Sequence, residues 1–297
     1  MKGAETGIRI RANKNGIGWL FVLLSVAMIT VFYFYPMVQS LILSLHTGTG
    51  SNFEFSGLEN YRRLFADKTF ITAVKNTFIY LLVQVPVMLL LALFLAVLLN
   101  DKKLKFKGFF RTAIFLPCVT SLVAYSVVFK YLFANDGLVN KMLLKLHLIE
   151  EPMQWLTDPF WAKVTIIIAL TWRWTGYNMI FYLSALQNVD PEIYEAARID
   201  GASAFQQFFR ITIPLLKPMI LFTSITSTIC TLQLFDEVMN ITQGGPGNAT
   251  LSISQYIYNL CFKYSSDFGY AATVSYSIVV MIVLLSIIQF KVAGDRK

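Results

Sequence analysis

The segment Glu195-Ala196-Ala197-Arg198-Ile199-Asp200-Gly201-Ala202 is a polar, helix-forming stretch that separates two long apolar stretches of this chain. Asp190 is a suitable N-cap, and Pro191 fits the first helical position, where a missing N–H costs no hydrogen bond. Gly201 can end the helix because glycine readily adopts the left-handed conformation. We therefore expect a short helix with a small, apolar surface, placed where two membrane spans meet water.

The chain beyond Gly201 is expected to form a second short helix. Phe205, Phe208 and Phe209 restart an apolar face at helical spacing, and Pro214 marks the entry into the next apolar stretch. A helix–glycine–helix elbow with alanines on one face is typical of a knob that docks into another protein.

The stretch from Leu186 to Pro218 resembles the cytoplasmic EAA loop of the permease subunits of bacterial ABC importers. Ile213 is a mild departure, because the family more often has leucine there. Gly57-Leu58-Glu59-Asn60-Tyr61 and Gly244-Gly245-Pro246 with Thr250 also resemble carbohydrate importers of the maltose type, and the second of these is similar to the F-subunit type of permease. The residues that match the loop are Glu195, Ala196, Ala197, Asp200, Gly201, Ile211, Pro214 and Pro218.

The composition indicates a membrane protein. Of the 297 residues 56% are hydrophobic and 14% are charged, and the mean hydropathy is +0.59, whereas soluble domains are about 25% charged. A helix needs about 20 apolar residues to cross the bilayer. We therefore predict an all-α integral membrane protein with six transmembrane helices, and the resemblance implies the type I ABC importer permease fold. The predicted spans are Ile17–Pro36, Thr77–Leu99, Phe109–Leu132, Val164–Leu183, Ile211–Phe235 and Tyr270–Phe290.

The chain is expected to contain one transport domain with short tails. Residues 1–15 form a cytoplasmic basic tail, and 16–72 form the first transmembrane helix with an external loop. Residues 73–291 form the ABC importer transmembrane domain, whose cytoplasmic coupling loop covers 186–210, and 292–297 form a second cytoplasmic tail. The stretch Gln243–Asn248 is typical of a turn, which either lines the outer mouth or merely connects two elements.

The distribution of the basic residues predicts the orientation. The net charge of +8 could suggest nucleic acid, but 15 of the basic residues lie in short segments on one side of the predicted spans. Only 8 lie on the other side, in longer loops. The positive-inside rule then places both termini and the Glu195 loop in the cytoplasm, and no nucleic acid is expected as a partner. The resemblance implies that the membrane is a bacterial cytoplasmic membrane. The 15 are Lys2, Arg9, Arg11, Lys14, Lys102, Lys103, Lys105, Lys107, Arg111, Arg198, Arg210, Lys217, Lys291, Arg296 and Lys297.

No stretch of the sequence indicates an enzyme. No phosphate-binding loop of the Gly-x-x-x-x-Gly-Lys type occurs, so this chain is not expected to bind ATP in that way, and ATP with Mg²⁺ would be bound by partner ATPase subunits. The three cysteines and two histidines lack the spacing of a metal or redox site, so no metal site and no catalytic residue are expected.

A candidate substrate path begins in the fourth span. Arg173 lies near the middle of that span, where insertion of a charge costs about 2.5 to 3.5 kcal/mol. A charged residue at such a position indicates a functional or structural role. Trp174 and Tyr177 share the helical face of Arg173, and aromatic rings beside a cation suit a sugar. The alternative is that Arg173 pairs with Asp236 or Glu237 and that the rings are packing.

The fifth span adds a polar stripe. Ser227, Thr231 and Leu234 lie along one face, which by resemblance to the maltose-type permease would face the translocation path. Hydroxyl groups in membrane helices also bond to the preceding turn and allow close packing. The sequence is compatible with both a path-lining role and a packing role for these side chains.

The resemblance implies a transmembrane subunit of a carbohydrate ABC importer. This chain would form half of a channel with a second, related permease, and two ATPase subunits would bind below. An extracytoplasmic sugar-binding protein would deliver the substrate, an oligosaccharide. The coupling residues would be Glu195, Ala196, Ala197, Asp200 and Gly201.

Two alternatives belong to other substrate or energy classes. An ABC importer for a glycerophosphate would need several basic residues within the membrane, and Arg173 is the only basic residue predicted there. An ABC importer for a polyamine would need acidic residues within the membrane, and none is predicted there. An ion-coupled secondary transporter would need an acidic residue near the membrane centre or short broken helices repeated in two halves, and neither is visible.

Overall fold

The computed structural model describes residues 19, 21–48, 53–101, 103–264 and 266–293. The predicted basic tail, 1–15, lies outside these residues, as does the tail from 294 onward. The described chain is almost entirely helical and divides into two compact units. The first unit contains residues up to Arg63 together with Leu260–Thr273, and the second contains Leu64–Asn259 with Val274–Lys297.

The first unit consists of a long apolar helix, a small hairpin and the segments that hold them. The helix covers Phe21–Ser44, includes one π-helical turn, and none of the side chains in its apolar window is buried within this chain. A helix that is apolar all round and has no core of its own to enter is typical of a membrane span. The elements are η1 (Thr30–Phe34), α2 (Tyr35–Ser44), β1 (His46–Thr47), β2 (Glu54–Phe55), α3 (Glu59–Ala66), η3 (Asn259–Lys263) and the first turns of α15 (Phe268–Ala293).

Buried polar contacts hold the first unit together. The two strands are antiparallel, with His46 opposite Phe55. The Asn60 amide donates to the carbonyls of Ser44 (3.1 Å) and His46 (2.8 Å). Gly269 lies so close that a Cβ there would stand 2.0 Å from the His46 carbonyl oxygen, so only glycine fits.

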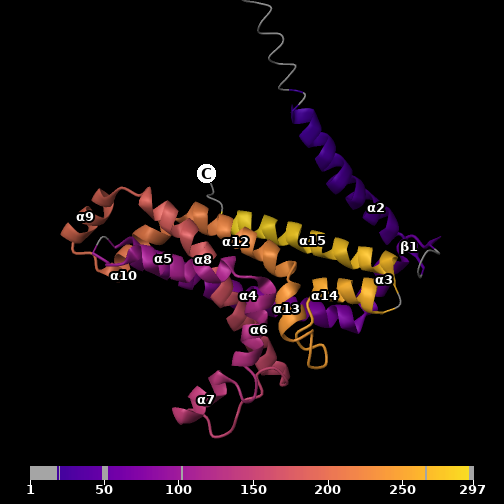
Figure 1. Ribbon diagram of the computed structural model, residues 1–297. Helices are drawn as coiled ribbons and strands as arrows, with labels where there is room; N and C mark the ends of the chain where they lie inside the picture. Colours follow the sequence, from indigo (N-terminus) through magenta and orange to yellow (C-terminus); the bar gives the residue numbers. More distant parts are fainter. Residues whose placement is uncertain (1–18, 20, 49–52, 102, 265, 294–297) are drawn as a thin grey trace, which may run out of the picture. The chain divides into compact units, whose positions relative to one another are not determined.

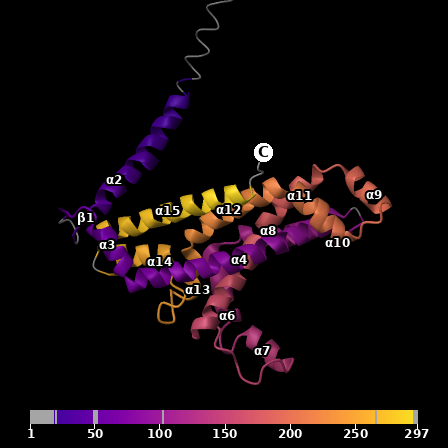
Figure 2. The ribbon, with the colours of Figure 1, turned by 180° about the vertical axis from the view of Figure 1, so that it is seen from behind.

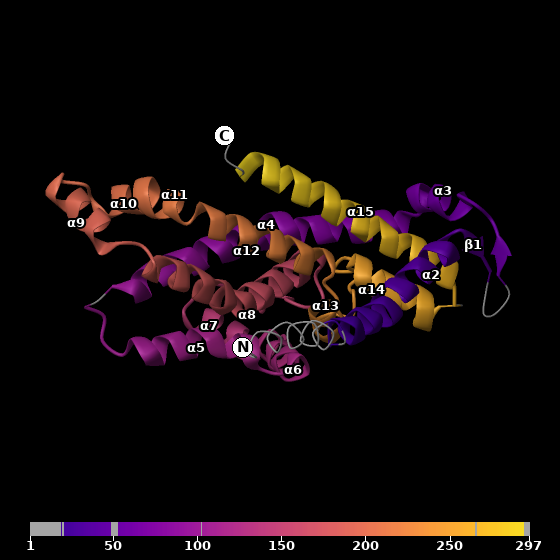
Figure 3. The ribbon, with the colours of Figure 1, turned by 90° about the horizontal axis from the view of Figure 1, so that it is seen from above.

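The second unit is a bundle of long helices with short helices at its ends. Figures 1 and 3 show α4, α5, α8 and α12 running along one general direction, with α9 and α10 at one end and α13 and α14 at the other; Figure 2 shows the same arrangement from behind. Its elements are α4 (Lys68–Asn100), α5 (Lys107–Val119), α6 (Leu122–Leu132), α7 (Leu138–Lys145), α8 (Pro159–Gln187), α9 (Pro191–Ile199), α10 (Ala204–Gln207), η2 (Phe208–Thr212), α11 (Ile213–Leu215), α12 (Lys217–Leu232), α13 (Asp236–Ile241), α14 (Ile253–Tyr258) and the rest of α15.

Small residues allow the central helices of the second unit to pack closely. Ala92 and Ala96 of α4 are fully buried in a cluster with Met179 and Leu183 of α8. At Gly176 of α8 a Cβ would stand 2.0 Å from the backbone carbonyl oxygen of Ile114 in α5. Membrane helices associate through such small-residue contacts, because lipid supplies no hydrophobic drive between them.

Two of the predicted straight spans are bent. The stretch Phe109–Leu132 divides into α5 and α6, which meet at 98° because Thr120 and Ser121 adopt extended backbone conformations. The stretch Ile211–Phe235 breaks before α12, where Ala204–Leu215 meets Lys217–Leu232 at 71°. Pro218 at the start of α12 lacks a backbone N–H, and this removes a hydrogen bond that a continuous helix would need.

The described helices agree with the predicted spans, apart from these bends. Three helices are long and apolar enough to cross a membrane, and up to five spans result if each bent pair counts as one. Helix α8, which covers the predicted fourth span, has 29 residues and is long enough at about 1.5 Å per residue, although it contains Arg173. The total of six spans therefore stays a prediction that is consistent with the structure.

Candidate functional site

Helix α9 forms where the sequence predicts it and is capped at both ends by local contacts. The Asp190 carboxylate accepts a hydrogen bond from the backbone N–H of Glu192 (3.0 Å), and Pro191 occupies the first turn. At the other end Gly201 has a φ of +79°, and the N–H of Ala202 donates back to the carbonyl of Ala197 (2.9 Å). This is the pattern of a Schellman cap, which requires a left-handed residue.

The second half of the elbow is also capped by its own residues. The hydroxyl of Ser203 accepts from the N–H of Gln206 (3.3 Å), and the Gln206 side chain accepts from the N–H of Ser203 (2.8 Å). This reciprocal pair is a capping box, and it starts α10 at once after the glycine turn. We refer to residues 190–212 as the elbow.

Most side chains of the elbow are exposed, whereas Phe208 packs against the buried cluster of α4 and α8 and Thr212 is buried. No residue of α9 is buried, Glu195 is exposed, and Ile199 is 87% exposed. Phe205 and Phe209 contact each other with ring centroids 4.5 Å apart and are both exposed. A hydrogen bond joins α9 to the next segment, between the hydroxyls of Tyr194 and Thr212, which are 3.1 Å apart. The elbow thus presents apolar and charged side chains on a locally built support.

Arg173 is buried inside the second unit and binds the break between α5 and α6. Its guanidinium donates to the carbonyl oxygens of Thr120 (3.1 Å), Cys118 (3.4 Å) and Pro117 (3.5 Å). The carbonyls at the end of a helix have no partner within it, and a cation there is stabilised by the helix dipole. Arg173 therefore stabilises the 98° break, a role that the linear sequence did not indicate.

The alternative interpretation, in which Arg173 pairs with Asp236 or Glu237, is not matched by an ion pair in the described part of the chain. Neither Asp236 nor Glu237 comes within 4.0 Å of the Arg173 nitrogens in the described part of the chain, although the charge of Arg173 acts on Glu237. Glu237 is itself only 5% exposed and lies beside Tyr125 and Trp174. The guanidinium stands 4.7 Å from the Tyr125 ring centroid, so the cation is held by carbonyls and an aromatic face.

Trp174 and Tyr177 belong to a row of aromatic rings along α8. Their ring centroids are 5.9 Å apart, Tyr177 contacts Phe181 at 5.0 Å, and Phe181 reaches Phe222 of α12 at 5.7 Å. Trp174 and Tyr177 are half-buried, so each keeps part of its ring accessible within this chain. Partly accessible rings in a row are compatible with stacking on a sugar.

The polar stripe of the fifth span is covered within this chain. Ser227 is 9% exposed and Thr231 is 7% exposed. Leu234 lies just beyond the end of α12, in the buried cluster against which Trp174 packs. No hydrogen bond or ring contact among the described residues joins Trp174 to Ser227 or Thr231. The predicted path residues on α8 and α12 are therefore connected through Leu234 and the aromatic row.

Polar residues in α4 that the sequence did not single out hold the turn after α13. The Asn76 amide donates to the carbonyls of Asn248 (2.9 Å) and Leu251 (3.1 Å), and the Tyr80 hydroxyl donates to the carbonyl of Thr250 (3.1 Å). These partners lie at least 170 positions away in the sequence, so no local pattern marks them. The signal that could have found them is the presence of amide and hydroxyl side chains inside an otherwise apolar span.

The sequence match to a known family covers most of the chain. Residues 64–293 match the family described as "Binding-protein-dependent transport system inner membrane component". This chain belongs to that family. The resemblance carried by the elbow is thereby confirmed, and the chain is an ABC importer permease, a transport component without enzymatic activity of its own.

The relatives of this permease are similar along almost their whole length. It is 60% identical over 282 residues to the lactose transport system permease protein LacF of Rhizobium radiobacter, covering 94% of this chain and 95% of the relative. It is 36% identical over 270 residues to the arabinooligosaccharides transport system permease protein AraP of Halalkalibacterium halodurans, covering 90% and 84%.

Solved structures of the same fold include a bacterial ABC transporter involved in the import of the acidic polysaccharide alginate. One chain of it matches with a TM-score of 0.83 at 22% identity, covering 96% of this chain and 98% of that one. The alginate transporter in complex with an alginate pentasaccharide-bound periplasmic protein matches with a TM-score of 0.84 at 22% identity, covering 97% of both chains. The likeness confirms the predicted ABC permease fold.

No group of three or more histidine, cysteine or acidic side chains gathers at metal-binding distance within the residues that the structure describes. The cysteines Cys118, Cys230 and Cys261 are free thiols. The candidate residues are divided between the elbow and the interior of the second unit.

Proposed function

We propose that this permease imports a saccharide, an oligosaccharide of short length, in an ATP-driven transporter. The observation that carries the proposal is the 60% identity to a lactose permease across almost the entire length of both proteins. The arabinooligosaccharide relative supports the same substrate class at greater distance. The half-buried aromatic row along α8 supports it chemically, because ring faces bind the apolar side of a sugar.

The permease acts as half of a channel in this proposal. A second, related permease completes the channel, two ATPase subunits bind ATP with Mg²⁺, and an extracytoplasmic sugar-binding protein delivers the substrate. The elbow is seated in a cleft of one ATPase through Glu195, Ala196, Ala197, Asp200 and Gly201. ATPase closure then moves both permeases from an inward-open to an outward-open state by rigid-body motion.

The orientation that we propose places both termini and the elbow in the cytoplasm of a bacterial cell. It is supported by the excess of basic residues in the short segments on the elbow side, which is the pattern of the positive-inside rule. The protein then spans the cytoplasmic membrane six times. The transport domain covers 73–291, as expected from the sequence.

The substrate path in this proposal runs along α8 and α12. Trp174 and Tyr177 supply accessible ring surface, and Arg173 stabilises the break between α5 and α6 through hydrogen bonds. Ser227, Thr231 and Leu234 form the α12 side of the path. Because Ser227 and Thr231 are covered in this chain, they would become accessible in another transport state.

Copurification and stimulated ATP hydrolysis test the proposal together. The permease is expressed with the ATPase and second-permease candidates encoded beside it, and the purified complex is placed in vesicles with the binding protein. Lactose, short arabinooligosaccharides and glycerol phosphate are then compared. Stimulation by a sugar-loaded binding protein supports the proposal, and stimulation by glycerol phosphate alone overturns it.

The purified single chain is the second half of this test. It contains no phosphate-binding loop, so it should neither hydrolyse ATP nor transport sugar by itself. Sugar uptake by the single chain in ATP-free vesicles, driven by a proton or sodium gradient, would support an ion-coupled transporter and contradict the proposal.

A further inference from the structure

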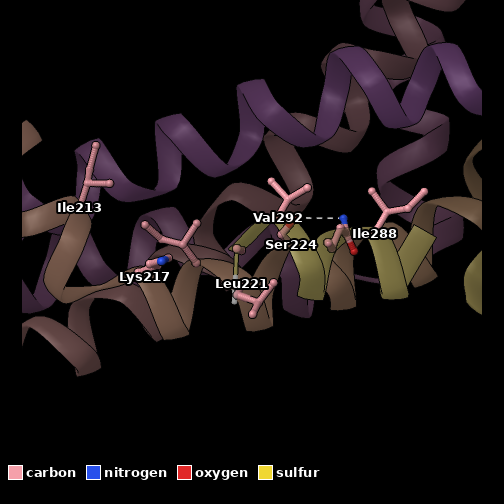
Figure 4. A pocket seen from close by; sticks show the side chains of 9 residues that line it. Ile213, Lys217, Leu221, Ser224, Ile288 and Val292 are labelled. Atoms are coloured by element: carbon pink, nitrogen blue, oxygen red, sulfur yellow. Dashed lines mark hydrogen bonds between the residues drawn. The ribbon is translucent and has the colours of Figure 1, made fainter. Parts of the chain in front are cut away.

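An apolar groove lies between α12 and the C-terminal turns of α15 (Figure 4). Its cavity volume is about 330 Å³. A dry apolar cavity of about 150 Å³ is already large enough to bind benzene, so this groove can hold a substantial apolar group. The residues that line it are Ile213, Lys217, Ile220, Leu221, Ser224, Ile288, Gln289, Val292 and Ala293.

The two helices are antiparallel along the groove, which gives it two different ends. Positions 217, 220, 221 and 224 form one stripe of α12, and Gln289 of α15 donates to the hydroxyls of Ser224 (3.2 Å) and Thr228 (2.8 Å). This contact places the stretch around Ile288 beside Ser224, so Val292 and Ala293 extend toward the Lys217 end. Figure 4 shows Lys217 beside Ile213 at one end and Ser224 and Ile288 toward the other.

The Lys217 end of the groove carries positive charge. Lys217 is half-buried and begins α12, so the positive end of the helix dipole adds to its ammonium charge. Helix α15 reaches this end in its last turns, after more than 20 uncharged residues, and a transmembrane helix of that length meets the headgroups there. Lys291 stands in the same last turn of α15.

We propose that this groove binds an anionic phospholipid, with the phosphate beside Lys217 and one acyl chain along Ile220, Leu221 and Ile288. The amphipathic layout carries the proposal: a cation and a helix N-terminus lie at one end, and apolar side chains line the rest. A basic pocket between transmembrane helices at one membrane surface is the arrangement that recognises anionic headgroups. The inference rests on membrane insertion of the family and is independent of the transported substrate.

The chemistry of the lining argues against a sugar in this groove. A saccharide needs several hydrogen-bonding groups that converge on it. Here the Ser224 hydroxyl and the Gln289 amide already bind each other, and the remaining lining is apolar apart from Lys217. The side chains of Ile288 and Val292 are also 54% and 81% exposed within this chain, as expected for positions that meet lipid.

Photolabelling of the assembled transporter tests the proposal. The complete complex is placed in phosphatidylcholine nanodiscs that contain a trace of phosphatidylglycerol with a photoreactive group in one acyl chain, and labelled peptides are mapped by mass spectrometry. We expect label on the α12 and α15 segments that contain Leu221 and Val292. The same photoreactive group on phosphatidylcholine should label these two segments about fivefold less, because the attraction between one lysine and one anionic headgroup is lost.

Two variants and one matched control separate specific binding from bulk lipid. Lys217→Gln should lower the phosphatidylglycerol label in the groove about fivefold. Lys105→Gln removes the same charge at an exposed position on the same proposed side and should leave the label unchanged. Leu221→Trp should lower the label from both lipids, with copurification of all subunits showing that the complex still assembles.

Three results would overturn the proposal. The first is equal labelling of the Lys217→Gln and Lys105→Gln complexes. The second is label spread evenly over the exposed face of α15 at Val280 and Leu284, which indicates bulk lipid only. The third is an unlabelled groove together with disulfide crosslinking of Val292→Cys to the second permease, which would assign the groove to a protein interface.

Discussion

The elbow and the Arg173 site are both predicted functional regions, but they are held by opposite kinds of contacts. In the elbow, every cap is formed by residues within a few positions of one another, and no side chain of α9 is buried. At Arg173, the guanidinium binds carbonyls more than 50 positions earlier in the chain and is 5% exposed. Local contacts leave the elbow's side chains available to a partner, whereas the long-range contacts of Arg173 use its hydrogen bonds inside the fold.

This difference separates two ways in which a substitution can abolish transport. A change in the elbow should disturb the coupling to the ATPase while the permease still folds and inserts. A change at Arg173 should destabilise the break between α5 and α6 and thereby the whole second unit. A transport measurement combined with a measurement of assembly or stability distinguishes the two outcomes.

The largest effect is expected from Arg173→Met. The variant leaves the carbonyls of Thr120, Cys118 and Pro117 without their donor, and hydrogen bonds to charged groups contribute about 1.5 to 3 kcal/mol. We expect much less assembled complex in detergent and a lower melting temperature. Arg173→Lys keeps the charge but loses the planar fork, so its effect should be intermediate. A stable Arg173→Met complex with lost uptake would instead place Arg173 in the substrate path.

The next largest effect is expected from Gly201→Val. A φ of +79° is strained for a β-branched residue, at about 1 to 3 kcal/mol, although a Cβ at Gly201 would meet no neighbouring atom within 4 Å. We expect uptake to fall at least about tenfold at unchanged assembly, because the angle of the elbow changes. Gly108→Val is the matched control, since that glycine also has open space and has a helical backbone. Equal uptake of the two variants would contradict a coupling role for the glycine turn.

Glu195→Ala should lower coupling about tenfold without affecting stability. Glu195 is exposed and its side chain forms no hydrogen bond or ion pair with the residues that the structure describes, so its loss removes a charged hydrogen bond only in a complex with an ATPase. The measurement is ATP hydrolysis stimulated by the sugar-loaded binding protein in reconstituted complexes. Glu151→Ala removes an exposed acid on the opposite proposed side and should have no effect. Full stimulated activity in the Glu195 variant would show that the coupling contact lies elsewhere.

Trp174→Ala should lower sugar uptake about fivefold, the effect of about 1 kcal/mol for one ring stacked on a sugar. Sugar affinity of the external binding protein serves as the internal control, because it is measured on a separate protein. The same variant should leave the melting temperature of the complex nearly unchanged if the half-buried ring of Trp174 mainly binds the sugar. Intact uptake with a lowered melting temperature would show that the aromatic row is packing.

The smallest effects are expected from Ser227→Ala and Thr231→Val. Each removes one hydroxyl, whose hydrogen bond contributes about 1 kcal/mol at most, so uptake should fall about twofold. Both positions are covered in this chain, and the loss should therefore appear in kcat of transport more than in substrate affinity. Unchanged uptake in the double variant would remove α12 from the proposed path.

The elbow and the apolar stretches could be predicted because their signals are local. Asp190, Pro191 and Gly201 mark the ends of α9 by the chemistry of caps alone, and the structure places those ends at 191 and 199. The apolar stretches coincide with helices because a run of about 20 apolar residues in a chain of this composition typically forms a membrane-spanning helix. The saccharide class followed from resemblance to relatives rather than from any single residue.

The breaks and the buried polar contacts could not be predicted for the opposite reason. Thr120 and Ser121 lie inside an apolar run, and the guanidinium of Arg173, which is distant in sequence, stabilises the extended conformation there. Asn76 and Tyr80 appear as isolated polar residues in a span, since their carbonyl partners lie in a distant turn. Periodicity in a window of about 18 residues contains no information about such partners.

The capped elbow has a consequence for protein engineering and for the origin of new transporters. Residues 190–212 contain both caps, the glycine turn and the Tyr194–Thr212 contact, so the segment forms its shape from its own sequence. Such a segment can be exchanged between permeases as a cassette without redesign of the membrane spans around it. A chimaera that carries the elbow of another permease should recruit that permease's ATPase while keeping its own sugar, so energy source and cargo can be recombined independently.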